Sequence, residues 1–160
     1  MTSTLAELLA HVPQVGRVSW IGLRPEREAP IEVRAEALLL ADRGIEGDRT
    51  GRQAGGSRQV TLVQWEHLDV LARLLGREQV DPALLRRNVA VAGINLRALM
   101  KRRFRVGEAL LEGTGGCHPC RKMEAALGDG GYAAMRGHGG ITARILEGGR
   151  IAVGDPVRAA

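Results

Sequence analysis

Two short strands and a tight turn are encoded in the stretch Phe104-Arg105-Val106-Gly107-Glu108-Ala109-Leu110-Leu111-Glu112. The predicted strands cover residues 104–106 and 109–112, and a Val-Gly-acid sequence lies at the reversal between them. A second Val-Gly-acid turn follows in Ala152-Val153-Gly154-Asp155, near the end of the sequence. Matched reversals between short strands are expected at the corners of a small β-barrel.

Further strands are predicted on both sides of this stretch, because short apolar and β-branched runs alternate with turn residues. The 22 glycines divide the sequence at short intervals, which suits many short strands. The additional predicted strands cover residues 14–23, 31–40, 58–63, 88–92, 141–146 and 150–153. Gly148 and Gly149 are predicted to join the last two of these strands as a hairpin.

Helices are predicted to be few and short. They are expected near residues 5–9, over 64–75, over 81–86 and from about residue 121. Gly76 is a good C-terminal stop for the second helix, and Asp81-Pro82 is a good start for the third. Because strands do not alternate regularly with long helices, we predict a mainly β fold, an antiparallel β-barrel with a few short peripheral helices. We expect it to form a single domain over residues 1–160.

Composition limits the classes of function. The sequence of 160 residues is 44% apolar and 26% charged, which is typical of a globular domain. Aromatic residues make up only 2%, too few for the stacking platforms that bind single-stranded nucleic acid. No apolar run approaches the roughly 18 residues of a membrane span, and the N-terminus does not resemble a secretory signal. We therefore expect a cytoplasmic protein that binds neither nucleic acid nor membranes.

The net charge of +5 comes almost entirely from arginine, since only Lys101 and Lys122 among the 23 basic residues are lysines. The arginines are scattered from Arg17 to Arg158, and the densest basic group lies at 101–105. Such scattering is typical of a solvated surface. It also suits a site for a phosphorylated or otherwise anionic small molecule, because guanidinium groups bind phosphate oxygens in pairs.

The two cysteines lie together in Gly115-Gly116-Cys117-His118-Pro119-Cys120-Arg121-Lys122. Basic neighbours and a helix that begins near Arg121 favour a thiolate, so we expect reactive or metal-binding sulfur. A thioredoxin-like dithiol has this spacing, but not so close to the end of a sequence. Zinc ligation by Cys117, Cys120 and His138, with His118, is a second possibility. A single working cysteine is a third, and two inert buried cysteines are the fourth.

Several separated segments together resemble one family. They are Gly44-Ile45-Glu46-Gly47-Asp48-Arg49, Arg58-Gln59-Val60-Thr61-Leu62, Arg86-Arg87-Asn88-Val89, Gly93, Gly107, Pro119-Cys120, Arg136-Gly137, Gly140, Gly148-Gly149 and Val153-Gly154-Asp155-Pro156-Val157. In this order and spacing they resemble the MOSC family, named for the C-terminal domain of molybdenum-cofactor sulfurases. The resemblance runs from about Gln14 to the end of the sequence and implies a stand-alone MOSC-type β-barrel.

The resemblance also implies a site. Cys120 occupies the position of the family cysteine, which in cofactor-binding relatives ligates molybdenum. Arg86 and Asn88 fall in the pterin and phosphate region, and His118 lies beside the ligand. Arg121 and His118 are then expected to keep the Cys120 thiolate ionised. Single-domain bacterial relatives are linked to detoxifying N-hydroxylated purines, and the mitochondrial amidoxime reductases use similar chemistry.

Three functions follow from this reasoning. The first is a molybdenum-cofactor (molybdopterin) oxidoreductase that reduces an N-hydroxylated small-molecule substrate, with a redox partner as electron donor. The second is a sulfur carrier with a persulfide on Cys120, loaded by a cysteine desulfurase, that holds no resident metal. The third is a binding module for an anionic ligand. Structural roles are also open, because Arg86 can cap the 81–86 helix and His138, Asp48 and Asp155 can serve turns.

Overall fold

Seven strands close into a barrel in the computed structural model, which describes residues 2–160. Around the ring they are β11 (Pro156–Ala159), β7 (Arg103–Val106), β8 (Ala109–Gly116), β9 (Ile141–Glu147), β5 (Val60–Gln64), β6 (Val89–Ala92) and β1 (Gly16–Leu23). Pairing of β1 with β11, Gly16 opposite Val157, completes the ring. An eighth strand, β2 (Glu32–Arg34), extends the sheet from β1. The predicted mainly β barrel is confirmed.

Antiparallel pairing dominates, and one neighbouring pair of barrel strands is parallel. Leu62 of β5 lies opposite Val89 of β6 in this parallel ladder. Parallel neighbours need a crossover, and here it carries α2 (Glu66–Leu74) and the 3₁₀ helix η2 (Pro82–Leu85). The helix predicted over 81–86 is therefore a short 3₁₀ turn, with Asp81 as its N-cap as expected.

A second, three-stranded sheet changes two of the predicted strands. It consists of β10 (Gly149–Ala152), β3 (Glu36–Leu40) and β4 (Gly44–Ile45). The strand predicted over 31–40 is divided, because the chain leaves the barrel sheet after β2 and enters this sheet at β3. The hairpin predicted at Gly148-Gly149 is wrong, since β10 pairs with β3. A Cβ at Gly148 would lie 2.6 Å from the Leu39 carbonyl oxygen, so the chain turns a tight corner against β3.

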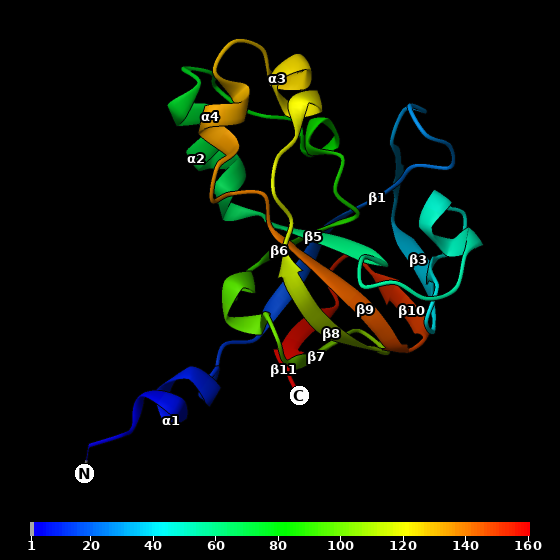
Figure 1. Cartoon of the computed structure of the whole chain (residues 1–160), viewed down its shortest axis with the longest axis vertical. Coiled ribbons are helices and arrows are strands. Elements are labelled where there is room, and N and C mark those ends of the chain that lie inside the picture. The colour runs from blue at the N-terminus through cyan, green and yellow to red at the C-terminus, as the bar shows by residue number, and fades with distance from the viewer. Residues whose placement is uncertain (1) are drawn as a thin grey trace.

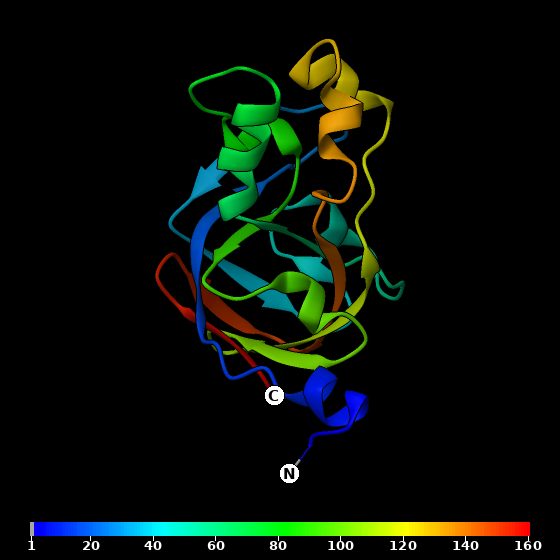
Figure 2. The same ribbon diagram turned by 90° about the vertical axis from the view of Figure 1, so that its left-hand side faces the viewer.

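Short helices gather at one end of the barrel. Figures 1 and 2 show α2 together with α3 (Arg121–Leu127) and α4 (Gly131–Met135) there, while α1 (Leu5–Ala10) projects from the opposite end. Two further 3₁₀ helices are η1 (Arg49–Arg52) and η3 (Leu96–Leu99). The helices near the N-terminus, after Gln64 and from Arg121 were predicted, and α4 was not.

Apolar side chains form two cores. One fills the barrel, with Phe104, Leu62 and Ile21 among its completely buried members. The other lies beneath the gathered helices and includes Leu71 and Leu127. The second core anchors α2, α3 and α4, and it thereby positions the loops that join them to the barrel. None of the helices formed by residues 2–160 is both long and apolar enough to cross a bilayer.

Candidate functional site

An arginine-rich cavity of about 420 Å³ opens among the loops that follow β1, β4 and η2. Five arginines line it, and we call it the arginine cavity: Arg24, Arg43, Arg49, Arg58 and Arg86. The acidic side chain in its lining is Asp48. Arginines in such excess over acids give the cavity a positive potential, which suits an anionic ligand with several oxygens.

Arg86 is the C-cap of η2, and its side chain lines the arginine cavity. It has left-handed backbone dihedrals (φ 58°) at the end of η2, where its backbone N–H bonds to Ala83. Its Nε and Nη2 are buried and find no hydrogen-bond partner within residues 2–160, and the same holds for Nε of Arg24. Burial lowers the pKa of Arg24, and the neighbouring charges of Arg86 and Arg49 lower it further. A bound phosphate would accept hydrogen bonds from these buried N–H groups, and its negative charge would reduce the repulsion between the two arginines.

Asp48 and Asn88 frame this cavity. Oδ1 of Asp48 accepts the Arg24 backbone N–H at 2.7 Å, and Oδ2 accepts the Thr50 hydroxyl and backbone N–H. The Asn88 amide nitrogen donates to Asp48 and to the Gly22 carbonyl, while its oxygen accepts from Thr61. The hydrogen-bonding capacity of the buried Asn88 side chain is thus used inside the protein. Asn88 lines the cavity as a support, and Asp48 caps η1 as a turn residue.

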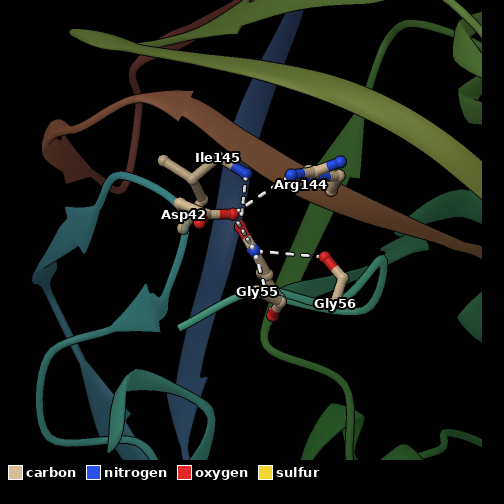
Figure 3. A network of polar contacts seen from close by, with 6 residues as sticks. Asp42, Gly55, Gly56, Arg144 and Ile145 are labelled. Atoms are coloured by element: carbon tan, nitrogen blue, oxygen red, sulfur yellow. Dashed lines mark hydrogen bonds and ion pairs between the residues drawn. The ribbon is translucent and has the colours of Figure 1, made fainter. Parts of the chain in front are cut away.

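The buried Gln59 side chain fixes the loop that carries Gly55 and Gly56 and borders the cavity. Figure 3 labels its partners Asp42, Gly55, Gly56 and Ile145. Its Nε2 donates to the carbonyls of Gly55 and Gly56 and to Asp42, and its Oε1 accepts the Ile145 N–H at 2.9 Å. Gln59 therefore ties the loop to β9 inside the barrel wall. Its polarity gave no signal of this role in the sequence.

The cysteine segment leads from β8 to α3, and its two thiols have different surroundings. Cys117 is buried, with 2% of its surface exposed, and Nη2 of Arg58 donates to its Sγ at 3.5 Å. Cys120 is exposed and begins α3 as its N-cap, without a side-chain cap hydrogen bond in the described chain. His118 and Arg121 are exposed on either side of Cys120. The four residues of this segment thus lie close together in sequence but differ in burial, since Cys117 is buried and His118, Cys120 and Arg121 are exposed.

Arg87 holds this segment in place, a role that sequence reasoning missed. Its guanidinium is buried and donates to three backbone carbonyls, those of Gly139 (2.8 Å), Leu85 (3.1 Å) and Cys117 (3.1 Å). Burial lowers the pKa of Arg87, while the Cys117 and Cys120 thiols act in the opposite direction. A buried cation therefore lies beside the CxxC segment. Nothing in the sequence distinguished it from the neighbouring Arg86.

A second cavity of about 290 Å³ lies on the other side of the cysteine segment, and we call it the histidine cavity. Its lining comes from three regions: the chain from Gly116 to Pro119, the α4–β9 loop, and the neighbourhood of α2 and η3. Cys117 lines this cavity, while the Arg58 side chain on its sulfur lines the arginine cavity. The cysteine segment therefore separates a cationic cavity from one of mixed polarity.

Two histidines meet at the edge of the histidine cavity. Nδ1 of His67, from α2, lies 3.2 Å from Nδ1 of His138, from the α4–β9 loop. Their rings pack edge to face, with centroids 4.6 Å apart and planes at 86°. His138 thus faces His67, and within residues 2–160 no three His, Cys, Asp or Glu side chains gather to hold a metal ion. The zinc site considered from the sequence has no support in this arrangement.

The molybdenum cofactor fits the residues that are present. Its phosphate needs several N–H donors, and the arginine cavity holds buried donors on Arg24 and Arg86 that no protein acceptor satisfies. Molybdenum takes thiolate sulfur from a protein as a soft ligand, and Cys120 is an exposed, uncapped thiol. The arginine cavity thus meets the phosphate requirement, while Cys120 lies outside its lining, at the start of α3.

Comparisons with known proteins agree with the fold. A family model described as MOSC domain matches residues 49–158. A search of curated proteins finds no match. Among solved structures, the YUAD protein from Bacillus subtilis has a TM-score of 0.75 at 18% identity, and the match covers 92% of this chain and 97% of the YUAD chain. YiiM from Escherichia coli has a TM-score of 0.67 at 22% identity, with coverage of 90% and 69%. YiiM from Geobacillus stearothermophilus has a TM-score of 0.72 at 18% identity, with coverage of 91% and 75%.

Proposed function

This chain belongs to the MOSC domain family, and we propose that it binds the molybdenum cofactor and reduces N-hydroxylated compounds. The observation that carries the proposal is the arginine cavity, where the buried Nε and Nη2 of Arg86 and the buried Nε of Arg24 have no acceptor in the described chain. A buried N–H group without an acceptor costs stability. Nε of Arg102 and of Arg144, outside the cavity, also has no partner in the described chain, so the proposal rests on the three such nitrogens that Arg24 and Arg86 bring to one cavity. Their presence is explained if a bound phosphate completes their hydrogen bonds.

Each part of the site has its own task in this proposal. Arg24 and Arg86 would hold the phosphate of the pterin, and Arg58 would extend the same positive surface toward the cysteine segment. Cys120 would supply the protein's sulfur ligand, with His118 and Arg121 near it in the sequence. Molybdenum, when bound, supplies the exchange of two electrons, and the protein supplies orientation and electrostatics. Arg87 would keep the segment at a constant distance from the barrel.

Metal content tests this proposal directly. After expression in a host that makes the cofactor, we expect about one molybdenum per chain in the wild-type protein and a loss of most of it in Cys120→Ser. Cys117→Ser is the matched control, since it changes the other cysteine of the same segment and should keep the metal. Full molybdenum content in Cys120→Ser would refute the assignment of the ligand, and a metal-free wild type would refute cofactor binding.

A sulfur carrier is the second candidate, and the exposure of Cys120 favours it. An uncapped thiol at the start of a helix is accessible to a cysteine desulfurase. In this case the wild-type chain should gain the mass of one sulfur atom after incubation with a desulfurase and cysteine, and reductant should remove it. Cys120→Ser should not gain that mass. If anion binding remains without either chemistry, the binding-module hypothesis is left.

The proposal also implies partners. A reductase needs an N-hydroxylated small molecule and an electron-transfer protein as its donor, whereas a sulfur carrier needs a desulfurase. Co-purification of a redox protein with the molybdenum-loaded chain would favour the first candidate.

A further inference from the structure

The His67–His138 pair has no part in the proposed cofactor site, and it brings together two imidazoles from distant parts of the sequence. The two residues lie 71 positions apart in the sequence, on α2 and on the α4–β9 loop, yet their Nδ1 atoms are 3.2 Å apart. Both side chains are half-buried. Two ring nitrogens at this distance share a hydrogen bond, so one Nδ1 carries a proton and the other accepts it.

This arrangement can move a proton from one ring to the other. In a neutral pair, the ring that donates through Nδ1 has a bare Nε2, and the ring that accepts has a protonated Nε2. When the bare Nε2 takes up a proton, the shared proton can cross between the Nδ1 atoms. The other ring can then release its own Nε2 proton. The pair can therefore carry a proton from the Nε2 atom of one ring to the Nε2 atom of the other.

One end of this connection is the histidine cavity, because His67 lines it. The same cavity is bordered by His118 and Pro119, and Cys120 is the next residue along the chain. A ligand in this cavity would thus lie beside Pro119, the residue that precedes the cysteine proposed to hold molybdenum.

The cavity is of mixed polarity, and part of its lining is apolar surface against which a flat ring can pack. Leu96, Met100 and Ile141 supply that apolar part, and Gly137 adds a position without a side chain. It contrasts in this respect with the arginine cavity, which suits anions. The cysteine segment between the two cavities places an anion site and a ring site on its opposite sides.

Burial and a neighbouring charge disfavour the protonated form of His67. Burial lowers its pKa, the charge of His138 lowers it further, and Glu66 opposes them. The Glu66 carboxylate is held by the Gly93 N–H at 2.9 Å and by Gln64. Arg97 lines the same cavity. An imidazole that shares a hydrogen bond with a second imidazole and lines a cavity is placed for proton transfer to a ligand there.

We propose that the histidine cavity holds the substrate of the proposed reductase, that His67 is its proton donor, and that His138 relays protons to His67 from solvent. This inference rests on the proposed function and names the acid of that reaction. Reduction of R–NH–OH to R–NH₂ breaks the N–O bond and consumes two electrons and two protons. The electrons come from the electron-transfer protein that serves as reductant. One proton goes to the departing oxygen, which leaves as water, and the other goes to nitrogen.

His67 is the catalytic residue in this proposal, and His138 is a positioning and relay residue. Removing a positioned general acid typically lowers the rate about 10²–10⁴-fold. We therefore expect His67→Asn, in the molybdenum-loaded enzyme, to lower kcat for an N-hydroxylated purine by about that factor at unchanged metal content. His138→Asn should lower kcat less and should change the pH profile and the solvent isotope effect, because His67 must then exchange protons directly with water. His11→Asn is the matched control and should behave as the wild type.

Substrate placement has a readout that does not depend on turnover. Adenine, the amine product of such a purine, should shift the imidazole ¹⁵N and ¹H signals of His67 in NMR spectra of the wild-type protein. The signals of His11 should not move. Circular dichroism of both Asn variants checks their folding, and His67→Gln provides a second variant if His67→Asn is unfolded.

The outcomes separate the two proposals. A molybdenum-loaded, active wild type whose kcat is unchanged by His67→Asn and His67→Gln overturns the proton-donor role alone. A wild type that lacks both molybdenum and reductase activity overturns the proposed function and with it the proton donor. Unshifted His67 signals at saturating adenine overturn the substrate cavity. A shift of His67 together with lost kcat at full metal content supports the proposal.

Discussion

Arg86 shows how a single residue can serve binding at the expense of folding. Its backbone is in the left-handed region at φ 58°, and two of its guanidinium nitrogens are buried without acceptors in the described part of the chain. The repulsion between Arg86 and Arg24 adds to this cost, since each cation disfavours the other. Residues that bind ligands commonly lower the stability of the fold in this way.

Replacing Arg86 separates its effect on anion binding from its effect on stability. We expect Arg86→Met to weaken binding of inorganic pyrophosphate at least tenfold, because the phosphate loses a bidentate donor. The same change should stabilise the ligand-free protein by about 1 kcal/mol and raise its Tm by about 2–4 °C. Calorimetry with pyrophosphate and thermal melts measure both effects. Arg103→Met, at an exposed position, is the control, and a lowered Tm in Arg86→Met would contradict the interpretation.

The lowered pKa of His67 predicts a pH dependence of stability. Burial and the charge of His138 lower its pKa, so the unfolded chain binds a proton on this residue more readily than the folded protein does. The stabilising contribution is therefore complete above the unfolded pKa of about 6.5 and decreases as the pH falls through that value toward the folded pKa. Thermal melts from pH 8 downward should show this loss, and His67→Asn should reduce it.

A separate loss is expected in more acidic solution. Hydrogen bonds from Gln59 and Arg144 lower the pKa of Asp42, and those from the Tyr132 and Gly130 amides lower the pKa of Glu124. These carboxylates stabilise the fold above their unfolded pKa of about 4 and lose that contribution below it. If His67→Asn leaves the loss between pH 6.5 and 5 unchanged, His67 is not its source.

At the scale of elements, the loop between α4 and β9 must lie directly against the cysteine segment. A Cβ added at Gly139 would overlap the Cys117 carbonyl oxygen and would crowd the Arg87 guanidinium. A Cβ at Gly115 would meet no described atom within 4 Å. Both backbones lie outside the positive-φ region, so the two sites differ in space and not in backbone strain.

This difference predicts unequal effects of one methyl group. Gly139→Ala should destabilise the protein by about 1–3 kcal/mol, because the two loops must separate. Gly115→Ala should change the free energy of unfolding by less than about 0.5 kcal/mol. Chemical denaturation measures both. Gly139→Ala should also lower molybdenum content, since it moves the segment that leads to Cys120, and equal stability of the two variants would refute the close contact.

Gln59 predicts a local change in a second loop. Gln59→Ala leaves the buried Ile145 N–H without its acceptor and frees the carbonyls of Gly55 and Gly56. We expect a loss of about 1–3 kcal/mol in stability and faster hydrogen exchange of the Ile145 amide. Gln79→Ala, at an exposed position, should change neither. Unaltered exchange at Ile145 would show that water replaces the side chain without cost.

At the scale of the whole molecule, closure of the barrel and the N-terminal helix contribute differently. None of the six residues of α1 is buried, although Thr4 and Glu7 form a complete capping box. By contrast, β11 pairs with both β1 and β7, and Val157 is fully buried. The last strand therefore closes the ring, while α1 lies outside both cores.

Two truncations test this contrast. Removal of residues 2–10 should shift the Tm by no more than about 4 °C, corresponding to about 1 kcal/mol, because little apolar surface loses its cover. Removal of residues 156–160 should prevent cooperative unfolding, since β1 and β7 are left as open edges. Circular dichroism melts distinguish the two. A cooperative transition after the C-terminal truncation would show that the barrel does not need its closing pair.

Local patterns were sufficient to predict the barrel, the short helices and the positions of most strands. Short apolar runs between glycines encode strands, and the turns at Gly107 and Gly154 lie between strands that the structure contains. Cys120 was singled out from the cysteine segment and the family resemblance, and Arg86 from that resemblance alone, and their roles stay predictions. The division of residues 31–40 and the pairing of β10 with β3 were not, because the same alternation suits a strand in either sheet.

The two cavities depend on contacts between residues that are far apart in the sequence. Arg24, Arg58 and Arg86 become neighbours only when three loops meet at one end of the barrel. His67 and His138 meet because α2 and α4 pack on the second core. Local sequence specifies backbone preference and apolar periodicity, which act between near neighbours. Convergence of charges and imidazoles depends on tertiary packing, and no short-range pattern records it.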